Sequence, residues 1–332
     1  MACYNPIVAY VVKNAKTENG KKVIIFKDNP LTDTEEIEIP CGKCIGCRMD
    51  YSKEWQVRII KEAEQWKDNA FLTLTYNNEN LPTKDVINEK TGEVTTGHPL
   101  KPEDLKQFIK KLRKVYYRKF GKTQIRFYAC GEYGGKTMRP HYHIALFNID
   151  TTAFNDIRKI GVSNAGCPIF TSERIEKIWG KGFITIGELT PESAAYIARY
   201  MLKKQKGDKK LWFYESQAIV PEMTRSSTHN GIAYNFIIEN AEKLSESDAI
   251  YVPRRNSRPI KHKIPTYGLR VLEKESPELY EKVRKMREEA KTPLEEKVMR
   301  CKNNSKGYFG ALKDKEENEE RRIKALVRPL QD

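Results

Sequence analysis

Two histidines in one short apolar segment, Pro140 to Phe147, are the side chains of this sequence best suited to bind a metal ion. Alternate side chains of a β-strand share a face, so His141 and His143 lie together while their neighbours point into a core. Two imidazoles about 7 Å apart along a strand can converge on one ion between them. Glu132, which we expect in the glycine-rich turn before this strand, can fold back as a third ligand. Two imidazoles and a carboxylate suit Mn²⁺ or Mg²⁺, with positions left for phosphate oxygens.

A histidine pair at this spacing also occurs by chance on partly exposed strands, where it binds nothing. The chain contains only five histidines, however, and two of them share this face beside a carboxylate. A metal site and a pair of ordinary histidines therefore both stay open as interpretations of these residues alone.

A helix expected over 191–204 carries a second group of reactive side chains. Thr190 is suited to be its N-cap, with Pro191 at the first helical position. One stripe of this helix is small and apolar and fits against a sheet; it comprises Ala194, Ile197, Ala198 and Met201. The neighbouring stripe comprises Tyr196, Arg199, Tyr200 and Lys203.

The two phenols of that stripe, Tyr196 and Tyr200, are one turn apart, about 6 Å along the helix axis. A phenol has a pKa of about 10 and attacks well only when a metal polarises its target or a cation stabilises the phenolate. Arg199 and Lys203 are placed to do either. The alternative is that both tyrosines are packing residues with surface hydroxyls, since the chain has 17 tyrosines.

The composition favours a polyanionic partner. Sixty Lys+Arg against 45 Asp+Glu give a net charge of +15, which attracts nucleic acid and other polyanions. No apolar run approaches the length of about 20 residues that a membrane span needs, and residues 1–10 do not resemble a secretory signal. We therefore expect a soluble protein inside a cell and no membrane partner.

Seven cysteines, an odd number, suit a reducing cytoplasm better than a disulfide framework. Cys41, Cys44 and Cys47 have a spacing that can share a structural Zn²⁺, but a closed zinc site needs four ligands and none follows nearby. Cys3 would complete the set if the N-terminal segment folds back. The alternative is free thiols in a buried turn.

The expected elements predict an α+β fold. Strands over 70–76, 124–130, 140–147 and 183–189, with helices over 102–120 and 172–179, give the order βαββαβ. This is the ferredoxin-like, RRM-like core, with a central antiparallel sheet and helices on one face, and the other face free for a ligand. Helices over 51–66 and 191–204 flank it, and a small hairpin is expected at 89–92. Residues 1–40 suggest irregular strands, and a charged helical extension ends the chain.

Three of these segments, in this order, resemble the motifs of the HUH endonucleases, and in particular the replication initiators of microviruses of the gokushovirus type. They are the strand Phe71-Leu-Thr-Leu-Thr75, the metal motif Arg139-Pro-His-Tyr-His143 and the tyrosine motif Tyr196-Ile-Ala-Arg-Tyr-Met-Leu-Lys203. The segment Cys41-Gly-Lys-Cys-Ile-Gly-Cys-Arg48 also resembles the phage branch. This chain has Tyr142 where the family has a bulky aliphatic residue, and Arg199 where a lysine is frequent.

The resemblance implies an enzyme that initiates rolling-circle replication by nicking and rejoining single-stranded origin DNA of a phage genome. It implies His141, His143 and Glu132 as ligands of Mn²⁺ or Mg²⁺, and a covalent 5′-phosphotyrosine formed by Tyr196 or Tyr200, assisted by Arg199 and Lys203. It further implies the host cytoplasm as location and a host DNA polymerase as partner. A host helicase is implied as well, because Gly134-Gly-Lys-Thr137 lacks the first glycine of a P-loop.

With this resemblance, the expected domains are an N-terminal extension over 1–66, an HUH endonuclease domain over 67–270 and a charged helical or partly disordered tail over 271–332. Two other functions fit the same sequence. One is a basic nucleic-acid-binding module without catalysis that uses an open sheet face. The other is a relaxase or transposase of the same superfamily.

Overall fold

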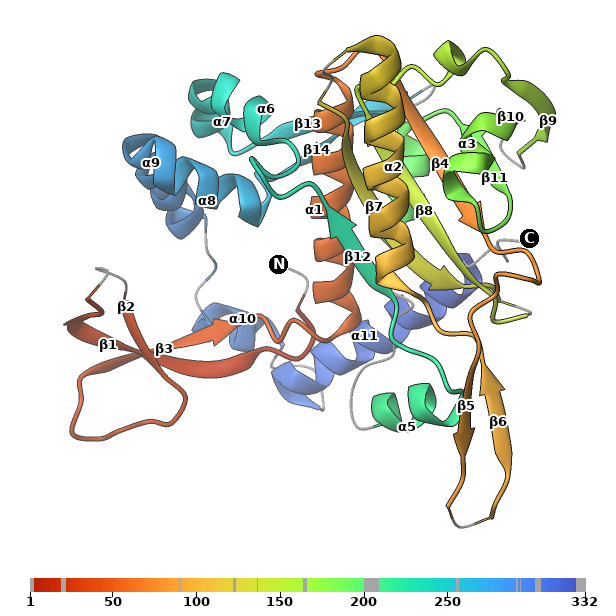
Figure 1. Cartoon of the computed structure of the whole chain (residues 1–332). Helices are drawn as coiled ribbons and strands as arrows, with labels where there is room; N and C mark the ends of the chain where they lie inside the picture. Colours follow the sequence, from red (N-terminus) through yellow and green to blue (C-terminus); the bar gives the residue numbers. More distant parts are fainter. Residues whose placement is uncertain are drawn as a thin grey trace. The chain divides into compact units, whose positions relative to one another are not determined.

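The computed structural model (Figure 1) describes residues 3–18, 22–89, 91–121, 124–135, 137–163, 166–199, 209–254, 257–290, 292, 294–301 and 306–326. The chain divides into two units. The smaller unit combines Met1–Tyr51 with Arg287–Gln331, and the larger unit is Ser52–Met286. The predicted division at residues 66 and 270 places the boundaries elsewhere and stays a prediction.

The larger unit is built around a seven-stranded antiparallel sheet with the order β12-β7-β8-β4-β11-β10-β9. The strands are β4 (Asn69–Thr75), β7 (Arg126–Tyr133), β8 (Pro140–Phe147), β9 (Arg158–Val162), β10 (Pro168–Thr171), β11 (Ile184–Gly187) and β12 (Met223–Ser226). Helix α2 (Pro102–Phe120) follows β4, and helix α3 (Glu173–Trp179) precedes β11. The central order β7-β8-β4-β11 is therefore that of a ferredoxin-like βαββαβ core. The predicted α+β fold class is confirmed.

Helices α2 and α3 cover one face of this sheet, as predicted (Figure 1). The apolar stripe of α2, including Leu105 and Leu112, and the indole of Trp179 from α3 are fully buried against Leu72 of β4 and Ile144 of β8. These side chains come from alternate positions of the strands, so the strands present their other positions to the opposite face.

Local sequence explains the bounds of both helices. Pro102 occupies the first turn of α2, and Gly121 ends it with a positive φ of 80°, a conformation that favours glycine. Ser172 caps α3 by accepting a hydrogen bond from the N–H of Ile175 at 3.2 Å.

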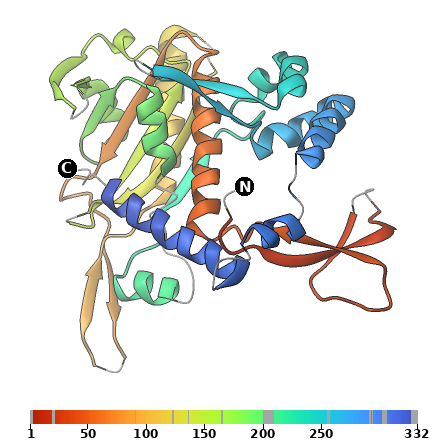
Figure 2. The same ribbon diagram turned by 180° about the vertical axis from the view of Figure 1, so that it is seen from behind.

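The opposite face of the sheet is also covered, which corrects the expectation of a face left free for a ligand. Figure 2 shows α1 (Ile45–Ala63) running across this side. Val57 of α1 and Ile197 of α4 (Pro191–Arg199) join a second buried cluster with Tyr128 of β7 and Phe147 of β8. The apolar stripe of α4 predicted packing against a sheet, but the βαββαβ pattern did not assign α1 and α4 to this face, because the two helices lie outside that repeat.

Three strands of the large sheet were not predicted. β9 and β10 form a hairpin that extends the sheet beyond β11, and β12 pairs with β7 at the other edge. All three contain only four or five residues and are too short to show a clear alternation. The hairpin expected at 89–92 is confirmed as β5 (Lys84–Ile87) and β6 (Val94–Gly97).

The remaining elements of the larger unit follow α4. They are α5 (Lys209–Ser216), α6 (Tyr234–Glu239), α7 (Ala241–Ser247), the hairpin of β13 (Ile250–Arg254) and β14 (Ser257–His262), α8 (Thr266–Glu275) and α9 (Pro277–Glu289). Helix α9 ends three residues past the boundary of the unit. A short 3-10 helix, Thr152–Phe154, lies between β8 and β9. A buried ion pair joins α1 to the sheet, since Arg126 Nε lies 2.6 Å from Glu62 Oε1. The other carboxylate oxygen of Glu62 accepts the N–H of Ala233 at 2.7 Å.

The smaller unit contains a three-stranded antiparallel sheet of order β2-β1-β3, where irregular strands were expected. Its elements are β1 (Ile7–Lys16), β2 (Lys22–Ile25), β3 (Thr34–Ile39), the start of α1, α10 (Leu294–Arg300) and α11 (Gly307–Leu326). Helix α1 begins six residues before the predicted position 51, at Ile45. The helices at the C-terminal end confirm the predicted charged helical extension.

Among the described residues, no helix is both long enough and apolar enough to span a membrane.

Candidate metal and tyrosine site

The two histidines lie on β8 with their side chains on the face covered by α1 and α4. They are largely buried, with relative exposures of 9% for His141 and 6% for His143. Tyr142 and Ile144 point to the other face and are fully buried beneath α2 and α3. The predicted alternation along this strand is thus observed, because its apolar positions are held in the core.

Glu132 lies directly opposite His141 on the neighbouring strand β7. Its Oε1 atom is 2.7 Å from Nε2 of His141 and 3.1 Å from Nε2 of His143. The expectation that Glu132 sits in a turn is wrong, since β7 continues to Tyr133. Paired strands bring the carboxylate to the histidines more directly than a turn folding back would.

Each imidazole is oriented by a contact at its second ring nitrogen. Nδ1 of His141 donates to the carbonyl oxygen of Arg139 at 3.2 Å, because a carbonyl can only accept. Nδ1 of His143 lies 2.9 Å from Oγ1 of Thr73 on β4. The ring of Phe71 stacks on His143 at a centroid distance of 5.6 Å. Such contacts fix the orientation of metal-binding imidazoles in proteins.

This donor set fits a metal ion. With Nδ1 of His141 protonated, Nε2 of the neutral ring carries a lone pair that faces a carboxylate oxygen at 2.7 Å. Two lone pairs at that distance repel unless a proton or a cation lies between them. The three ligand atoms of Glu132, His141 and His143 all lie within 4.8 Å of one another, the arrangement that one cation requires.

The electrostatics keep the carboxylate ionised. Burial alone would raise the pKa of Glu132, but the two adjacent imidazoles, which stabilise the ionised carboxylate when they are protonated, outweigh it and lower the pKa to about 2. The carboxylate of Glu132 is therefore ionised at physiological pH.

The tyrosine helix α4 packs beside the histidine strand. Thr190 caps it as predicted, since its Oγ1 accepts the N–H of Ser193 at 3.2 Å. The ring of Tyr196 lies 5.2 Å from that of His143, nearly perpendicular to it. Arg199 is exposed and its Nε donates to the carbonyl of Ala195, so its guanidinium is turned back along the helix. Tyr200 and Lys203 lie outside the described residues.

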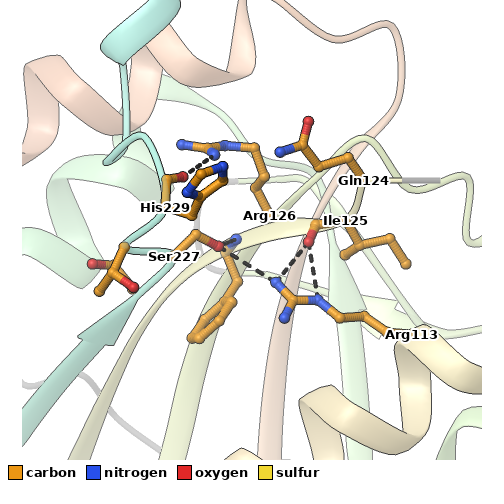
Figure 3. Close-up of a pocket in the computed structure, with 9 residues that line it drawn as sticks. Arg113, Gln124, Ile125, Arg126, Ser227 and His229 are labelled. Carbon is orange, nitrogen blue, oxygen red and sulfur yellow. Dashed lines mark hydrogen bonds between the residues drawn. The ribbon is translucent and has the colours of Figure 1, made fainter.

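A pocket at the opposite end of β7 (Figure 3) is a weaker candidate for a functional site. It is six residues, about 20 Å, along the strand from Glu132. Its two arginines are already engaged: Arg126 binds Glu62 and the carbonyl of His229, and Arg113 donates to the carbonyl of Ile125 at 2.7 Å. The two guanidinium groups of this pocket are therefore largely committed to protein acceptors.

Comparison with known proteins agrees with this geometry. Residues 69–205 match the family of the replication-associated protein ORF2, a range that contains the histidine strand and the tyrosine helix. The chain is 35% identical to the replication-associated protein ORF2 of Spiroplasma virus 4, over 99% of this chain and 98% of that relative. The chain belongs to this family of phage replication-associated proteins.

Two further relatives cover less of this replication-associated protein. Replication-associated protein VP4 of Bdellovibrio phage phiMH2K is 34% identical over 61% of the chain and 58% of the relative. Replication-associated protein ORF4 of Chlamydia phage 1 is 29% identical over 50% of the chain and 38% of the relative. No solved structure gives a significant match. The resemblance to phage replication initiators is confirmed, and it assigns the protein to the replication of a phage genome.

Sequence reasoning missed the side chains that support the histidines. Phe71 and Thr73 were noted only as part of a strand motif, and Arg139 only as part of the metal motif. The alternation of residues 71, 73 and 75 to the face opposite Leu72 and Leu74 was visible in the sequence. What was not visible is the register that sets Thr73 opposite His143.

Proposed function

We propose that this protein is a metal-dependent endonuclease and strand transferase that initiates rolling-circle replication of a phage genome. It nicks and rejoins single-stranded origin DNA through tyrosine. The observation that carries the proposal is the convergence of both histidine Nε2 atoms on one carboxylate oxygen, with the Tyr196 ring 5.2 Å from the His143 ring. Membership of the replication-associated family supports it.

In this proposal Glu132, His141 and His143 hold one divalent cation, Mn²⁺ or Mg²⁺. Three protein ligands leave coordination positions for oxygen atoms of the substrate. When bound, the cation supplies Lewis-acid polarisation of the scissile phosphate. Thr73 and the carbonyl of Arg139 hold the imidazoles in the orientation that ligation needs, and the buried carboxylate supplies charge.

Tyr196 or Tyr200 supplies the nucleophile. The phenol oxygen forms a bond to phosphorus while the bond from phosphorus to the 3′ oxygen breaks, which gives a 5′-phosphotyrosine. The phenol proton is lost to solvent and the leaving oxygen gains one, so a free 3′-hydroxyl remains to prime synthesis. After one round the second tyrosine attacks the regenerated junction, forms a new phosphotyrosine and releases a 3′-hydroxyl. That hydroxyl attacks the first phosphotyrosine, whose phenol leaves as the circle closes. We assign Arg199 and Lys203 to stabilising phenolate or phosphate charge.

The remaining assignments follow from this role. The DNA partner is the replication origin of the phage genome, and the net charge of +15 favours binding to it. We propose host helicase and DNA polymerase as partners and the host bacterial cytoplasm as location.

A non-catalytic binding module explains the structure less well. Recognition domains of that kind stack bases on exposed aromatic side chains of the central strands. Here Tyr128 on β7 is fully buried, and the Trp55 ring of α1 lies 4.5 Å from it. The sheet face offers a cluster of metal ligands in place of an open stacking surface.

The test is a covalent-adduct gel with the full-length protein and single-stranded oligonucleotides that cover candidate origin hairpins. Wild-type protein with Mn²⁺ should give a protein–DNA adduct resistant to denaturation. Tyr196→Phe combined with Tyr200→Phe should abolish it, whereas Tyr117→Phe, an exposed tyrosine of α2, should leave it unchanged. Adducts that persist in the double variant would show that the nucleophile is another residue. Adducts that never form with any origin oligonucleotide would favour the binding module.

A further inference from the structure

Four cysteines come together in the smaller unit, away from any role in the proposed nicking reaction. The Sγ atoms of Cys3, Cys41, Cys44 and Cys47 all lie within 4.8 Å of one another. None of the seven cysteines, all of which are among the described residues, forms a disulfide. The sequence left open whether Cys3 would join the other three.

The three-stranded sheet explains why Cys3 reaches the cluster. β1 and β3 are antiparallel, and Ile7 of β1 pairs with Ile39 of β3. Cys3 precedes this pair by four residues and Cys41 follows it by two, so both cysteines leave the same end of the sheet. The N–H of Cys41 then donates to Sγ of Cys3 at 3.3 Å. The N-terminal segment is therefore folded back beside the Cys41–Cys47 turn.

The sulfur spacing matches a single tetrahedral ion. A zinc–sulfur distance of about 2.3 Å separates the sulfurs of a tetrahedral site by about 3.8 Å. Sγ of Cys3 lies 3.9 Å from Sγ of Cys44. In a four-iron cluster each sulfur would bind a different iron, and the four sulfurs would lie further apart. Four sulfurs at this spacing enclose one ion and leave no open position for a substrate.

Backbone donors point at the sulfurs as they do at metal-bound thiolates. The N–H groups of Lys43 and Cys44 both donate to Sγ of Cys41, at 3.4 and 3.3 Å. Those of Tyr4 and Cys47 donate to Sγ of Cys44, at 3.3 and 3.4 Å. A neutral thiol is a weak acceptor, whereas a thiolate accepts several such bonds, and hydrogen bonds of this kind support metal ligands.

We propose that Cys3, Cys41, Cys44 and Cys47 bind one structural Zn²⁺. The ion closes the chain around the three-stranded sheet and fixes the N-terminal segment to the start of α1. Around it, Glu316 of α11 accepts the N–H of Ile45 at 3.2 Å and the amide of Asn5 at 2.7 Å.

The smaller unit needs such a link because its apolar core is small. Among its described residues, five hydrophobic side chains are buried: Ala9, Val11, Cys44, Ile45 and Ala311. Two of these are alanines, and one is a proposed ligand. Small cores of this kind are commonly stabilised by a structural metal, whose binding energy becomes folding energy.

The first test uses wild-type, full-length protein purified without added metal. Metal analysis should give one zinc per chain, and X-ray absorption should give four sulfur neighbours at about 2.3 Å. Protein in which Co²⁺ replaces this zinc should show the intense near-ultraviolet absorption of thiolate–cobalt bonds. The double variant His141→Ala with His143→Ala should keep all three signatures, which separates this site from the nicking site. The inference does not rest on the proposed function.

Variants then test the ligand set. Cys3→Ser and Cys47→Ser should each lose the bound zinc, whereas Cys167→Ser, a partly buried cysteine of the larger unit, should keep it. A nitrogen or oxygen ligand shell, iron in place of zinc, or a disulfide involving Cys3 in the wild-type protein would overturn the proposal. Because the wild-type measurements need no substitution, a variant that fails to fold cannot mask that result.

Discussion

The two clusters of metal-ligating side chains differ in the elements that hold them. Glu132, His141 and His143 lie on two paired strands in the middle of a seven-stranded sheet, with helices on both faces. The four cysteines lie in the N-terminal segment, just before α1 and in the first turn of α1, beside a three-stranded sheet that buries few apolar side chains. The first cluster is supported by the fold around it, whereas we propose that the second, with its zinc ion, supports its own surroundings.

They differ equally in the chemistry that they offer. Two imidazoles and a carboxylate are three ligands, which leave positions open for a substrate oxygen. Four thiolates complete a tetrahedral shell, so they exclude substrate and stabilise structure. The number of ligands and the rigidity of the strands or turns that hold them together distinguish the proposed catalytic site from the proposed structural site in this chain.

Metal removal should give the largest difference between the clusters. Brief treatment with EDTA should abolish adduct formation, because an open site with oxygen and nitrogen ligands exchanges its ion readily. The same sample, desalted, should still contain one zinc per chain, since a closed thiolate shell offers the chelator no entry. Addition of Mn²⁺ should restore the adducts. Zinc and activity that are lost together, at one rate, would remove the distinction.

Glu132→Gln should lower the rate of adduct formation by about 10³-fold, which corresponds to losing about 4 kcal/mol of electrostatic support for the cation. The amide keeps the size of the side chain but not its charge, so the thermal unfolding temperature should change little. The rate is measured with saturating origin oligonucleotide. Glu103→Gln, on the exposed surface of α2, is the matched control and should behave as wild type. A Glu132→Gln protein with wild-type rate would remove Glu132 from the ligand set.

Thr73→Val should have a smaller effect on the same site. It removes the hydroxyl that contacts Nδ1 of His143 at 2.9 Å, and loss of such a support typically weakens metal affinity by about 10- to 100-fold. The expected result is a higher Mn²⁺ concentration for half-maximal nicking, with nearly wild-type activity at saturating Mn²⁺.

Thr185→Val is the control for that experiment. Thr185 lies opposite Thr73 on β11, and among the described residues no hydrogen bond joins its side chain to either histidine. An equal shift in both variants would mean that the hydroxyl of Thr73 acts only through strand packing.

The sequence predicted the core of the larger unit well because its patterns are strong there. Helix α2 was predicted at its observed bounds, and β8 likewise, since a proline begins each and the apolar spacing is regular. Glu132 was identified as a ligand but assigned to a turn, because glycines nearby suggested that the strand had ended. The covering of the second face by α1 and α4 depends on contacts between distant segments, which periodicity does not report.

The smaller unit was the least predictable part. Strands β1, β2 and β3 bury few of their side chains fully, so the alternation that reveals a strand is weak. Whether Cys3 joins the other cysteines depends on the β1–β3 register, a long-range pairing that spacing alone cannot give. The sequence therefore identified candidate metal ligands in both units. It predicted how they come together in space only in the larger unit, where a regular apolar pattern defines the core.

Tyr76→Phe should have the smallest effect on the nicking site, because Tyr76 lies in the core on the face of the sheet opposite the two histidines. Its hydroxyl donates to Asp104 at 2.8 Å and lies 3.0 Å from that of Tyr142. Losing these buried contacts should cost about 1–2 kcal/mol of folding free energy, seen as a lower denaturant midpoint. Adduct formation by the folded protein should stay at the wild-type rate. Tyr117→Phe, an exposed tyrosine of the same unit, should leave both quantities unchanged.

The pH dependence of the difference in stability between wild type and Tyr76→Phe tests the role of the Tyr76 hydroxyl. Burial, together with the neighbouring Tyr142 and Asp104, raises the pKa of Tyr76 above its usual range. A raised pKa means that the neutral phenol stabilises the fold fully below about pH 10, and that this contribution is lost as the pH rises further. The difference in unfolding free energy between wild type and Tyr76→Phe should therefore shrink above pH 10. A non-zero difference that stays constant from pH 8 to pH 11 would mean that folding does not raise the pKa of Tyr76, and a difference of zero at every pH would mean that its hydroxyl does not stabilise the fold behind the histidine strand.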